Sequence, residues 1–148
     1  MMMEVCAKRF EELSCEELYE IIKVRIAVFS LEQNCLYQDL DDKDKSAYHV
    51  YIKENGEIKA YLRVLDSGVA FEEVTIGRVL TTERGKEFGN RILEEGIRVA
   101  KEKMNADAIK IEAQSYAKGY YEKFGFRQIT DEFLEDGIPH IGMMLQIR

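Results

Sequence analysis

A short glycine-containing turn has the residue types needed to bind an anion. It reads Arg84-Gly85-Lys86-Glu87-Phe88-Gly89 and follows a β-branched run. Glycine has no Cβ, so a ligand can approach the backbone closely. The start of a helix adds free N–H groups and the positive end of the helix dipole, so we expect a phosphate or pyrophosphate site aided by Arg84 and Lys86. The turn lacks the full dinucleotide or Walker pattern, so a turn that binds no ligand is an equally open interpretation.

Acid–base and metal chemistry have few other candidates among the histidines and cysteines. The chain has two histidines, His49 and His140, and three cysteines, Cys6, Cys15 and Cys35, with no Cys-x-x-Cys pair. This pattern predicts neither a disulfide framework nor a zinc site. We therefore expect reduced thiols, a cytoplasmic setting and no bound metal.

The overall charge narrows the classes of partner. The 148 residues include 21 Lys and Arg against 28 Asp and Glu, for a formal net charge of −7. Nucleic acid is not expected, because phosphate backbones need a basic surface, and the acidic balance mildly favours a cationic substrate. No apolar run approaches the roughly 20 residues of a membrane span, and the start lacks the apolar segment of a signal peptide. We expect no membrane partner.

The glycine turn requires a strand before it and a helix after it. The β-branched run that begins at Glu73 predicts the strand, and apolar residues at helical spacing predict a helix that ends near Lys103. Residues 108–113 alternate as a second strand. Two strands that flank one helix predict a right-handed crossover and a parallel strand pair.

The last third of the chain predicts a short helix and two strands. Residues 117–124 fit a helix that Gly125 ends, and residues 126–130 begin a strand. Asp136-Gly137 marks a turn, and residues 141–147 form the last strand, with Pro139 before it.

The N-terminal half predicts a strand, a helix and a hairpin. Residues 5–10 fit a short edge strand, and Ser14-Cys15-Glu16-Glu17 has the form of a capping box for an amphipathic helix over residues 15–30. Strand-like runs at residues 48–54 and 57–65 flank Asn55-Gly56. That dipeptide favours a two-residue type I′ turn, and hence a β-hairpin.

Two features of this half have more than one interpretation. Arg25 falls among the apolar positions of its helix, so either its stem snorkels over the core or its charge points into a pocket. Residues 31–47 are acidic without a regular period, and we interpret them as a solvated loop, because a metal site needs a defined ligand pattern. The order of elements predicts a single domain over residues 1–148, with one mixed sheet and helices on its faces.

This order of elements, with an Arg/Gln-x-x-Gly-x-Gly/Ala type of turn after the fourth strand, resembles the GNAT acyltransferases. Residues 117–126 are similar to that superfamily's helix ending in Tyr-x-x-x-Gly-Phe, and residues 28–35, 37–39 and 135–143 resemble its ElaA-type subgroup. The resemblance covers nearly the whole chain. It implies an α/β, GNAT-like acyl-CoA acyltransferase fold: a single mixed, mostly antiparallel sheet with helices on both faces and a parallel central pair.

The resemblance also implies a reaction, namely direct transfer of an acetyl group from acetyl-CoA to a primary amine of a small molecule or peptide. In the family the pantetheine arm pairs with the fourth strand, and the pyrophosphate lies on the following helix start. The cofactor-binding residues implied here are Val79, Leu80, Thr81, Arg84, Gly85, Lys86, Glu87, Phe88, Gly89 and Asn90. Tyr121 matches the family's proton donor to the departing thiolate, and a tyrosine that only walls the core or cofactor is the alternative.

The acceptor side has several candidate residues. A base should assist, because an alkylamine with a pKa near 10.4 is neutral only to roughly one part in a few thousand at pH 7. The candidates for the substrate pocket are Arg25, Glu32, Gln33, Arg78, His49 and His140. His140 is preferred to His49 because it lies in a subgroup-like stretch, while a structural role is open for each. Cys35 is not expected to be a nucleophile, since direct transfer needs no acyl-enzyme.

Two departures from the family pattern support a second interpretation. Glu87 replaces the usual glycine, and the connection from residues 77–79 to Arg84 is shortened. A carboxylate at a helix start suits the dipole but opposes a pyrophosphate. The alternative that they support is a catalytically weak CoA-binding or regulatory module of the same fold. An unrelated α/β phosphate-binding protein is a third interpretation. Edge strands need cover in an open sheet, which leaves a homodimer open.

Overall fold

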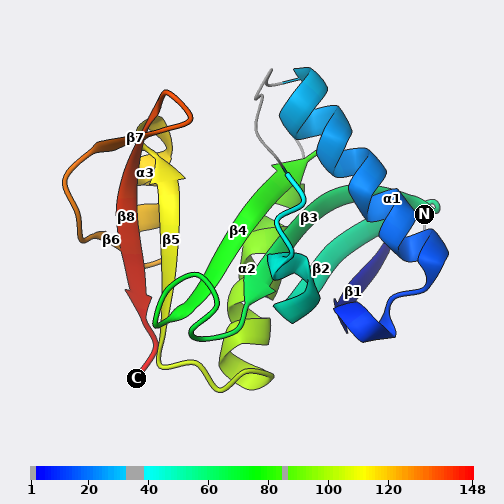
Figure 1. Ribbon diagram of the computed structural model, residues 1–148, viewed down its shortest axis with the longest axis horizontal. Helices are drawn as coiled ribbons and strands as arrows, with labels where there is room; N and C mark the ends of the chain where they lie inside the picture. The colour runs from blue at the N-terminus through cyan, green and yellow to red at the C-terminus, as the bar shows by residue number, and fades with distance from the viewer. Residues whose placement is uncertain (1–2, 33–38, 85–86) are drawn as a thin grey trace.

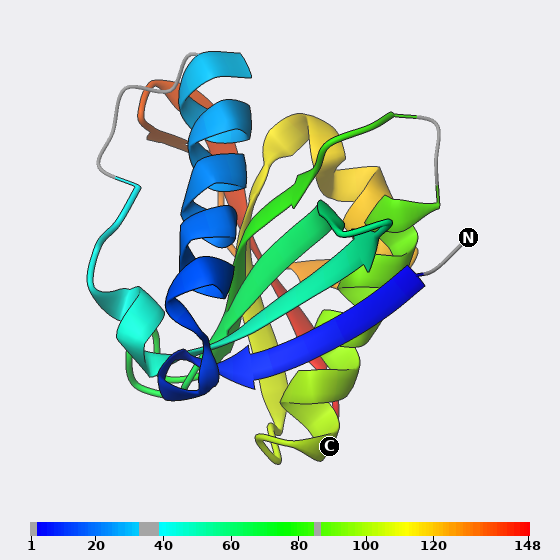
Figure 2. The same ribbon diagram turned by 90° about the vertical axis from the view of Figure 1, so that its right-hand side faces the viewer.

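The computed structural model describes residues 3–32, 39–84 and 87–148, which form one mixed sheet with helices on both faces (Figures 1 and 2). The eight strands are arranged in the order β1-β2-β3-β4-β5-β8-β6, and β7 pairs with β8. The strands are β1 Met3–Arg9, β2 Ala47–Glu54, β3 Glu57–Leu65, β4 Val74–Thr81, β5 Ala108–Gln114, β6 Arg127–Gln128, β7 Phe133–Glu135 and β8 Ile138–Gln146. The α-helices are α1 Cys15–Arg25, α2 Phe88–Glu102 and α3 Lys118–Glu122.

Two apolar clusters hold the helices to the sheet. On one face α2 buries residues such as Ile92 and Leu93 against strands β2 to β5. On the other face Ile21 of α1 packs with Tyr61 and Leu80. Figure 2 shows α1 and α2 on opposite sides of the sheet. No helix in the described part of the chain is both long and apolar enough to cross a membrane.

Local signals at the N-terminal end form the expected structures. The capping box is confirmed, since Ser14 Oγ accepts from the Glu17 amide at 3.1 Å and Glu17 Oε1 accepts from the Ser14 amide at 2.8 Å. The expected helix over residues 15–30 is α-helical only to Arg25 and continues as a π-helix over Ile26–Glu32. The expected edge strand is β1, which pairs with β2 alone in the described sheet.

The Asn55-Gly56 hairpin is confirmed. Asn55 and Gly56 have φ values of 54° and 81°, so both occupy the left-handed region that a type I′ turn requires. They join β2 to β3, whose residues pair from Glu54–Glu57 to Ala47–Leu65.

The central pair of strands is parallel, as predicted, but it is short. β4 and β5 pair at Val74–Ile109 and Thr75–Lys110, and beyond these residues the strands diverge (Figure 1). On its other edge β4 has a one-residue bulge against β3, because Tyr61 pairs with Leu80 while Arg63 pairs with Gly77. Arg78 lies in the bulge with φ of 52°. The divergence opens the space that forms the site.

The C-terminal region contains a hairpin that the sequence did not predict in full. Strand β7 Phe133–Glu135 pairs with β8, and the expected Asp136-Gly137 turn joins them with φ values of 51° and 76°. β8 begins at Ile138, so Pro139 lies inside the last strand and not before it. β8 pairs with β5 only from His140 onward, so Pro139 has one open edge, where the missing N–H is tolerated.

Candidate active site

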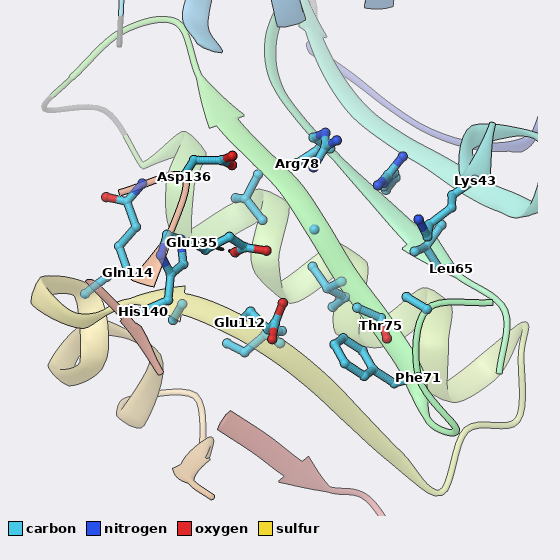
Figure 3. A pocket seen from close by; sticks show the side chains of 18 of the residues that line it. Lys43, Leu65, Phe71, Thr75, Arg78, Glu112, Gln114, Glu135, Asp136 and His140 are labelled. Carbon is cyan, nitrogen blue, oxygen red and sulfur yellow. Dashed lines mark ion pairs between the residues drawn. The ribbon is translucent and has the colours of Figure 1, made fainter. Parts of the chain in front are cut away.

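A cleft of about 610 Å³ lies where β4 and β5 diverge (Figure 3). Its walls include residues 75–79 of β4, residues 111–114 of β5 and residues 69–71 of the preceding loop. The β7–β8 hairpin contributes Glu135, Asp136, Ile138 and His140, and α3 contributes Tyr121. The cleft therefore combines backbone at the open edge of β4 with titratable side chains from the C-terminal strands.

Carboxylates and an imidazole gather on the β5 side of this cleft. Glu112 pairs with Gly142 across the β5–β8 ladder, and Gln114 pairs with His140, so alternation places Glu112 and His140 on the same face. The His140 Nε2 atom lies 3.6 Å from Glu135 Oε2, and Figure 3 shows Glu112 directed toward the same space. Partial burial and the nearby charge of Glu135 raise the pKa of Glu112 above its ordinary 4.5.

His140 is oriented by its own strand. Its Nδ1 donates to the Ile138 carbonyl oxygen at 2.7 Å, and its ring stacks on Phe133 with centroids 6.2 Å apart. The residue is buried, with 9% exposure. Because Nδ1 carries the donated proton, Nε2 of the neutral ring is the atom left to accept a proton.

Tyr121 enters the cleft from α3. Its ring packs edge-on against Tyr120 and Phe126, with centroid distances of 5.3 and 5.9 Å. Burial raises the pKa of Tyr121 to about 12, so the residue is a protonated phenol at neutral pH. No described residue forms a hydrogen bond with its hydroxyl group, which leaves that proton available to a ligand in the cleft.

The described members of the expected cofactor set lie along β4, in the segment after it and at the start of α2. Val79 lies in the bulge beside Arg78, and Leu80 and Thr81 follow it; in the described sheet β5 does not pair with this part of β4. Glu87 caps α2 without a side-chain bond to the helix backbone, and its carboxylate accepts from Asn90 Nδ2 at 3.2 Å. Arg84 is exposed.

Of four further members of the expected phosphate site, the structure describes Phe88 and Gly89. Phe88 is a core residue with 7% exposure, so only its backbone amide remains for a ligand. A Cβ on Gly89 would make ordinary contacts, 3.5 Å from the Tyr120 hydroxyl and 3.9 Å from Thr81 Cγ2, so packing alone does not require glycine there. Gly85 and Lys86 lie outside the described residues.

Arg25 is not in the cleft, which corrects the pocket interpretation, and its charge does not snorkel to solvent either. The side chain is 1% exposed, its Nε lies 2.8 Å from Asp39 Oδ2 and its Nη1 lies 2.7 Å from Asp44 Oδ1. These contacts belong to a closed ring of alternating charges, which we call the arginine–aspartate ring. Its members in order are Arg25, Asp39, Arg78, Asp41, Arg63 and Asp44.

The ring corrects the interpretation of residues 31–47 as a solvated loop at Asp39, Asp41 and Asp44, whereas Asp42 and Lys45 are exposed as expected. Asp39 and Asp44 are buried, and Asp41 receives a bidentate pair of bonds from Arg63, both 2.8 Å long. Arg63, Arg78 and Asp41 also line the cleft. The acidic segment therefore forms part of the cleft wall and is held there by three arginines from three different elements.

His49 lies beneath this ring and not in the cleft. Its Nδ1 accepts from the Tyr61 hydroxyl at 2.7 Å, and its Nε2 donates to the Asp44 carbonyl oxygen at 2.9 Å. Burial lowers the pKa of His49, so its imidazole stays neutral. Both nitrogens are occupied by the fold, which favours the structural role for His49.

The structure therefore brings together part of the expected set. Tyr121, Arg78, Val79 and His140 line one cleft, whereas Arg25 and His49 do not. Gln33 and the side chain of Glu32 lie outside what the structure describes. The sequence did not point to Glu112, Glu135 or Asp136. Glu112 could have been found because it is a polar residue between buried Ile111 and Ala113 in an alternating strand.

Comparison with known proteins gives a consistent family. The chain matches the acetyltransferase (GNAT) domain family over residues 11–147. It is 37% identical to protein ElaA of Escherichia coli over 140 residues, which cover 92% of each chain. The crystal structure of Escherichia coli ElaA superposes with a TM-score of 0.91 at 36% identity, over 98% of this chain and all of the other. An acyl-CoA N-acyltransferase from Pseudomonas aeruginosa has the same TM-score at 33% identity, over 97% and 99% of the two chains.

Proposed function

The chain belongs to the GNAT acetyltransferase family, and from this premise we propose that it transfers an acetyl group from acetyl-CoA to a primary amine. The observation that carries the proposal is the short β4–β5 pairing, which leaves β4 with an open edge beside Tyr121 and Glu112. An open strand edge can bind an extended ligand through backbone hydrogen bonds. The same opening leads into a cleft whose groups can accept and donate protons.

The start of α2 and the open edge of β4 fit acetyl-CoA as a co-substrate. The pantetheine arm would pair with the backbone of Val79, Leu80 and Thr81. The pyrophosphate would take the amides of residues 85–90 at the start of α2, with Arg84 and Lys86 adding charge. The carboxylate of Glu87 accepts a hydrogen bond from the Asn90 side chain, which holds it against the first turn of α2.

Glu112 and Tyr121 divide the proton transfers between them. The amine must attack as the free base, and Glu112 accepts its proton, because a carboxylate with a raised pKa is a stronger base than an ordinary one. His140 Nε2 provides a second proton acceptor on the same β5 side of the cleft. Tyr121 remains protonated at neutral pH and donates to the departing thiolate.

Two measurements test the proposal. Calorimetric titration with acetyl-CoA and desulfo-CoA should show saturable binding that ATP does not share. Thiol release in the presence of a panel of primary amines should then depend on enzyme and amine together. Binding without turnover by any amine would favour the alternative, a CoA-binding or regulatory module, and absence of CoA binding would contradict both.

The position of Glu87 favours this alternative, the CoA-binding or regulatory module. Glu87 is the N-cap residue of α2, so a pyrophosphate bound at this helix start would lie close to its negative charge even though the carboxylate accepts from Asn90. A Glu87→Gly variant should therefore bind CoA more tightly than the wild type if the phosphate site is used. Equal affinity would place the pyrophosphate away from this residue.

A further inference from the structure

We infer that the chain forms a twofold-symmetric dimer in which β1 pairs with β1 of a second copy, antiparallel and centred on Cys6. This inference concerns a surface away from the cleft and does not depend on the proposed function. It starts from the position of β1 at the end of the strand order. In Figure 2 this strand lies across the front of the molecule, with no described helix or strand beyond it.

The two edges of the sheet are not equally protected against pairing. At one edge β6 has two residues and neighbouring β7 has three, and such short strands offer little backbone to another chain. At the other edge β1 is seven residues long, has no proline and pairs with β2 in unbroken register. Its outer side is therefore a regular row of N–H and C=O groups, which is the surface that a further strand needs.

The geometry of antiparallel pairing limits how two copies of β1 can meet. Backbone groups alternate in direction along a strand, and outward-pointing groups must face outward-pointing groups of the partner. Two identical strands related by a twofold axis are therefore centred on a residue and not between two residues. This leaves a small number of possible registers, which the side chains distinguish.

The charges of β1 select the register centred on Cys6. Glu4 and Lys8 lie on the same face as Cys6 because side chains alternate. Centring on Cys6 sets Glu4 opposite Lys8 of the partner subunit, and does so twice. Centring on Glu4 or Lys8 would oppose like charges, and centring on Val5 or Ala7 would set neither charge opposite the other. Charges on an edge strand normally discourage pairing, but this opposite-signed pair is complementary to itself.

The opposite face of β1 suits the same register. Val5 and Ala7 are partly buried and pack against the main apolar cluster beneath α2. In the Cys6-centred register Val5 faces Ala7 of the partner subunit, so the apolar layers of the two copies would be continuous. Directly opposed side chains of this kind stabilise a strand pair.

The two charged residues are available for these contacts. Glu4 is exposed and forms no ion pair among the residues that the structure describes. Lys8 Nζ lies 2.6 Å from Glu17 Oε2, which fixes its ammonium group beside the edge, and its side chain remains 37% exposed. An ammonium group has three donors, so Lys8 can hold Glu17 and Glu4 of the partner subunit together.

Sedimentation at several protein concentrations tests the dimer. The wild type should reach twice the 17.2 kDa mass of the chain. Glu4→Lys should raise the dimer dissociation constant roughly tenfold, because two modest attractions become two modest repulsions. Glu122→Lys makes the same change of charge at an exposed position of α3, on the far side of the sheet from β1 in Figure 1, and should leave the constant unchanged.

Cysteine cross-linking tests the register. In a Cys15→Ser, Cys35→Ser background Cys6 is the sole thiol, and oxidation by copper phenanthroline should give a covalent dimer, because Cys6 faces its own copy across the axis. The matched control is a Cys6→Ser, Cys35→Ser protein. Its remaining Cys15 is exposed at the start of α1, and it should give little covalent dimer.

Each outcome decides the inference. A wild-type dimer that Glu4→Lys weakens and Glu122→Lys does not supports it. A monomer at all concentrations overturns it, and so does a dimer that both variants leave equally stable. If circular dichroism shows that Glu4→Lys does not fold, the cross-link decides: dimers through Cys6 support the register, and dimers through Cys15 alone refute it.

Discussion

Arg78 and Asp39 are joined by an ion pair in which the guanidinium Nε lies 2.8 Å from the carboxylate Oδ1. Arg78 lies in the bulge of β4 with φ of 52°. Residues other than glycine adopt this left-handed conformation only at a cost in free energy. A second bond from Arg78 Nη2 to the Asp39 carbonyl oxygen, 3.0 Å long, fixes the same residue. The pair therefore ties the acidic segment to the point where β4 turns away from its neighbour and opens the cleft.

Breaking the arginine–aspartate ring should destabilise the fold strongly. Arg25→Ala removes a cation that pairs with both Asp39 and Asp44. Two buried carboxylates then lose a positive partner and its hydrogen bonds, and water does not replace them. We expect a loss of about 3–5 kcal/mol in the free energy of unfolding, measured by chemical denaturation. Arg98→Ala, which breaks an exposed pair with Glu95 on α2, should cost at most about 1 kcal/mol. Similar losses in the two variants would show that the ring adds no more than surface pairs do.

Acid should weaken the fold through Asp41 and Asp44 of this ring. Burial opposes ionisation of Asp41 and Asp44, but Arg63 and Arg25 outweigh it, and the pKa of each aspartate falls below its ordinary 3.8. A lowered native pKa gives stability that is complete above the unfolded value and is lost as pH falls through the native value. The free energy of unfolding should thus decline below about pH 4.

An Asp41→Asn variant provides the control for this acid dependence. It removes one titrating group, so its free energy of unfolding should start lower at neutral pH and fall less steeply below about pH 4. Parallel curves for variant and wild type, measured by denaturation at each pH, would contradict the assignment.

Tyr121 should matter for turnover more than for binding. Tyr121→Phe removes only the hydroxyl that no described residue bonds, so the fold and the CoA affinity should be retained while kcat falls roughly 10²-fold. The matched control is Tyr116→Phe, since Tyr116 lines the same cleft but is 85% exposed. Full kcat in Tyr121→Phe would remove this residue from acid catalysis.

Glu112 should determine the acidic limb of the rate profile. The reaction needs ionised Glu112, so kcat/KM should rise with pH as this carboxyl group loses its proton, above its ordinary pKa of 4.5. Glu135→Gln removes a charge that raises this pKa, so the limb should move to lower pH. The amine ionises in the same way whichever enzyme is used. The shift of the acidic limb along the pH axis therefore reports the pKa of Glu112 alone. Glu112→Gln should lower kcat/KM roughly 10²-fold, and an unmoved limb in Glu135→Gln would refute the coupling.

Much of the fold was predictable because its signals are local. Asn55-Gly56 requires a hairpin because both residues adopt positive φ, and Ser14 with Glu17 caps a helix through atoms three residues apart. The alternation of residues 108–113 and the helix before them led to the parallel pair. The boundaries that were wrong, such as the end of α1 at Arg25, depend on how the following segment packs.

The sequence by itself determined the family and most of the order of elements, and it led us to predict roles for Tyr121 and His140. Tertiary structure alone decided that Arg25 is a buried partner of Asp39, 14 residues away, and that the backbone of Asp39 meets Arg78, 39 residues further on. It also decided that Glu112 on β5 shares a cleft with Glu135 from a separate hairpin. Charges attract without regard to sequence separation, and no local pattern encodes which of many aspartates a given arginine will meet. The partners are selected only when the sheet brings the strands into register and the cleft between β4 and β5 is formed.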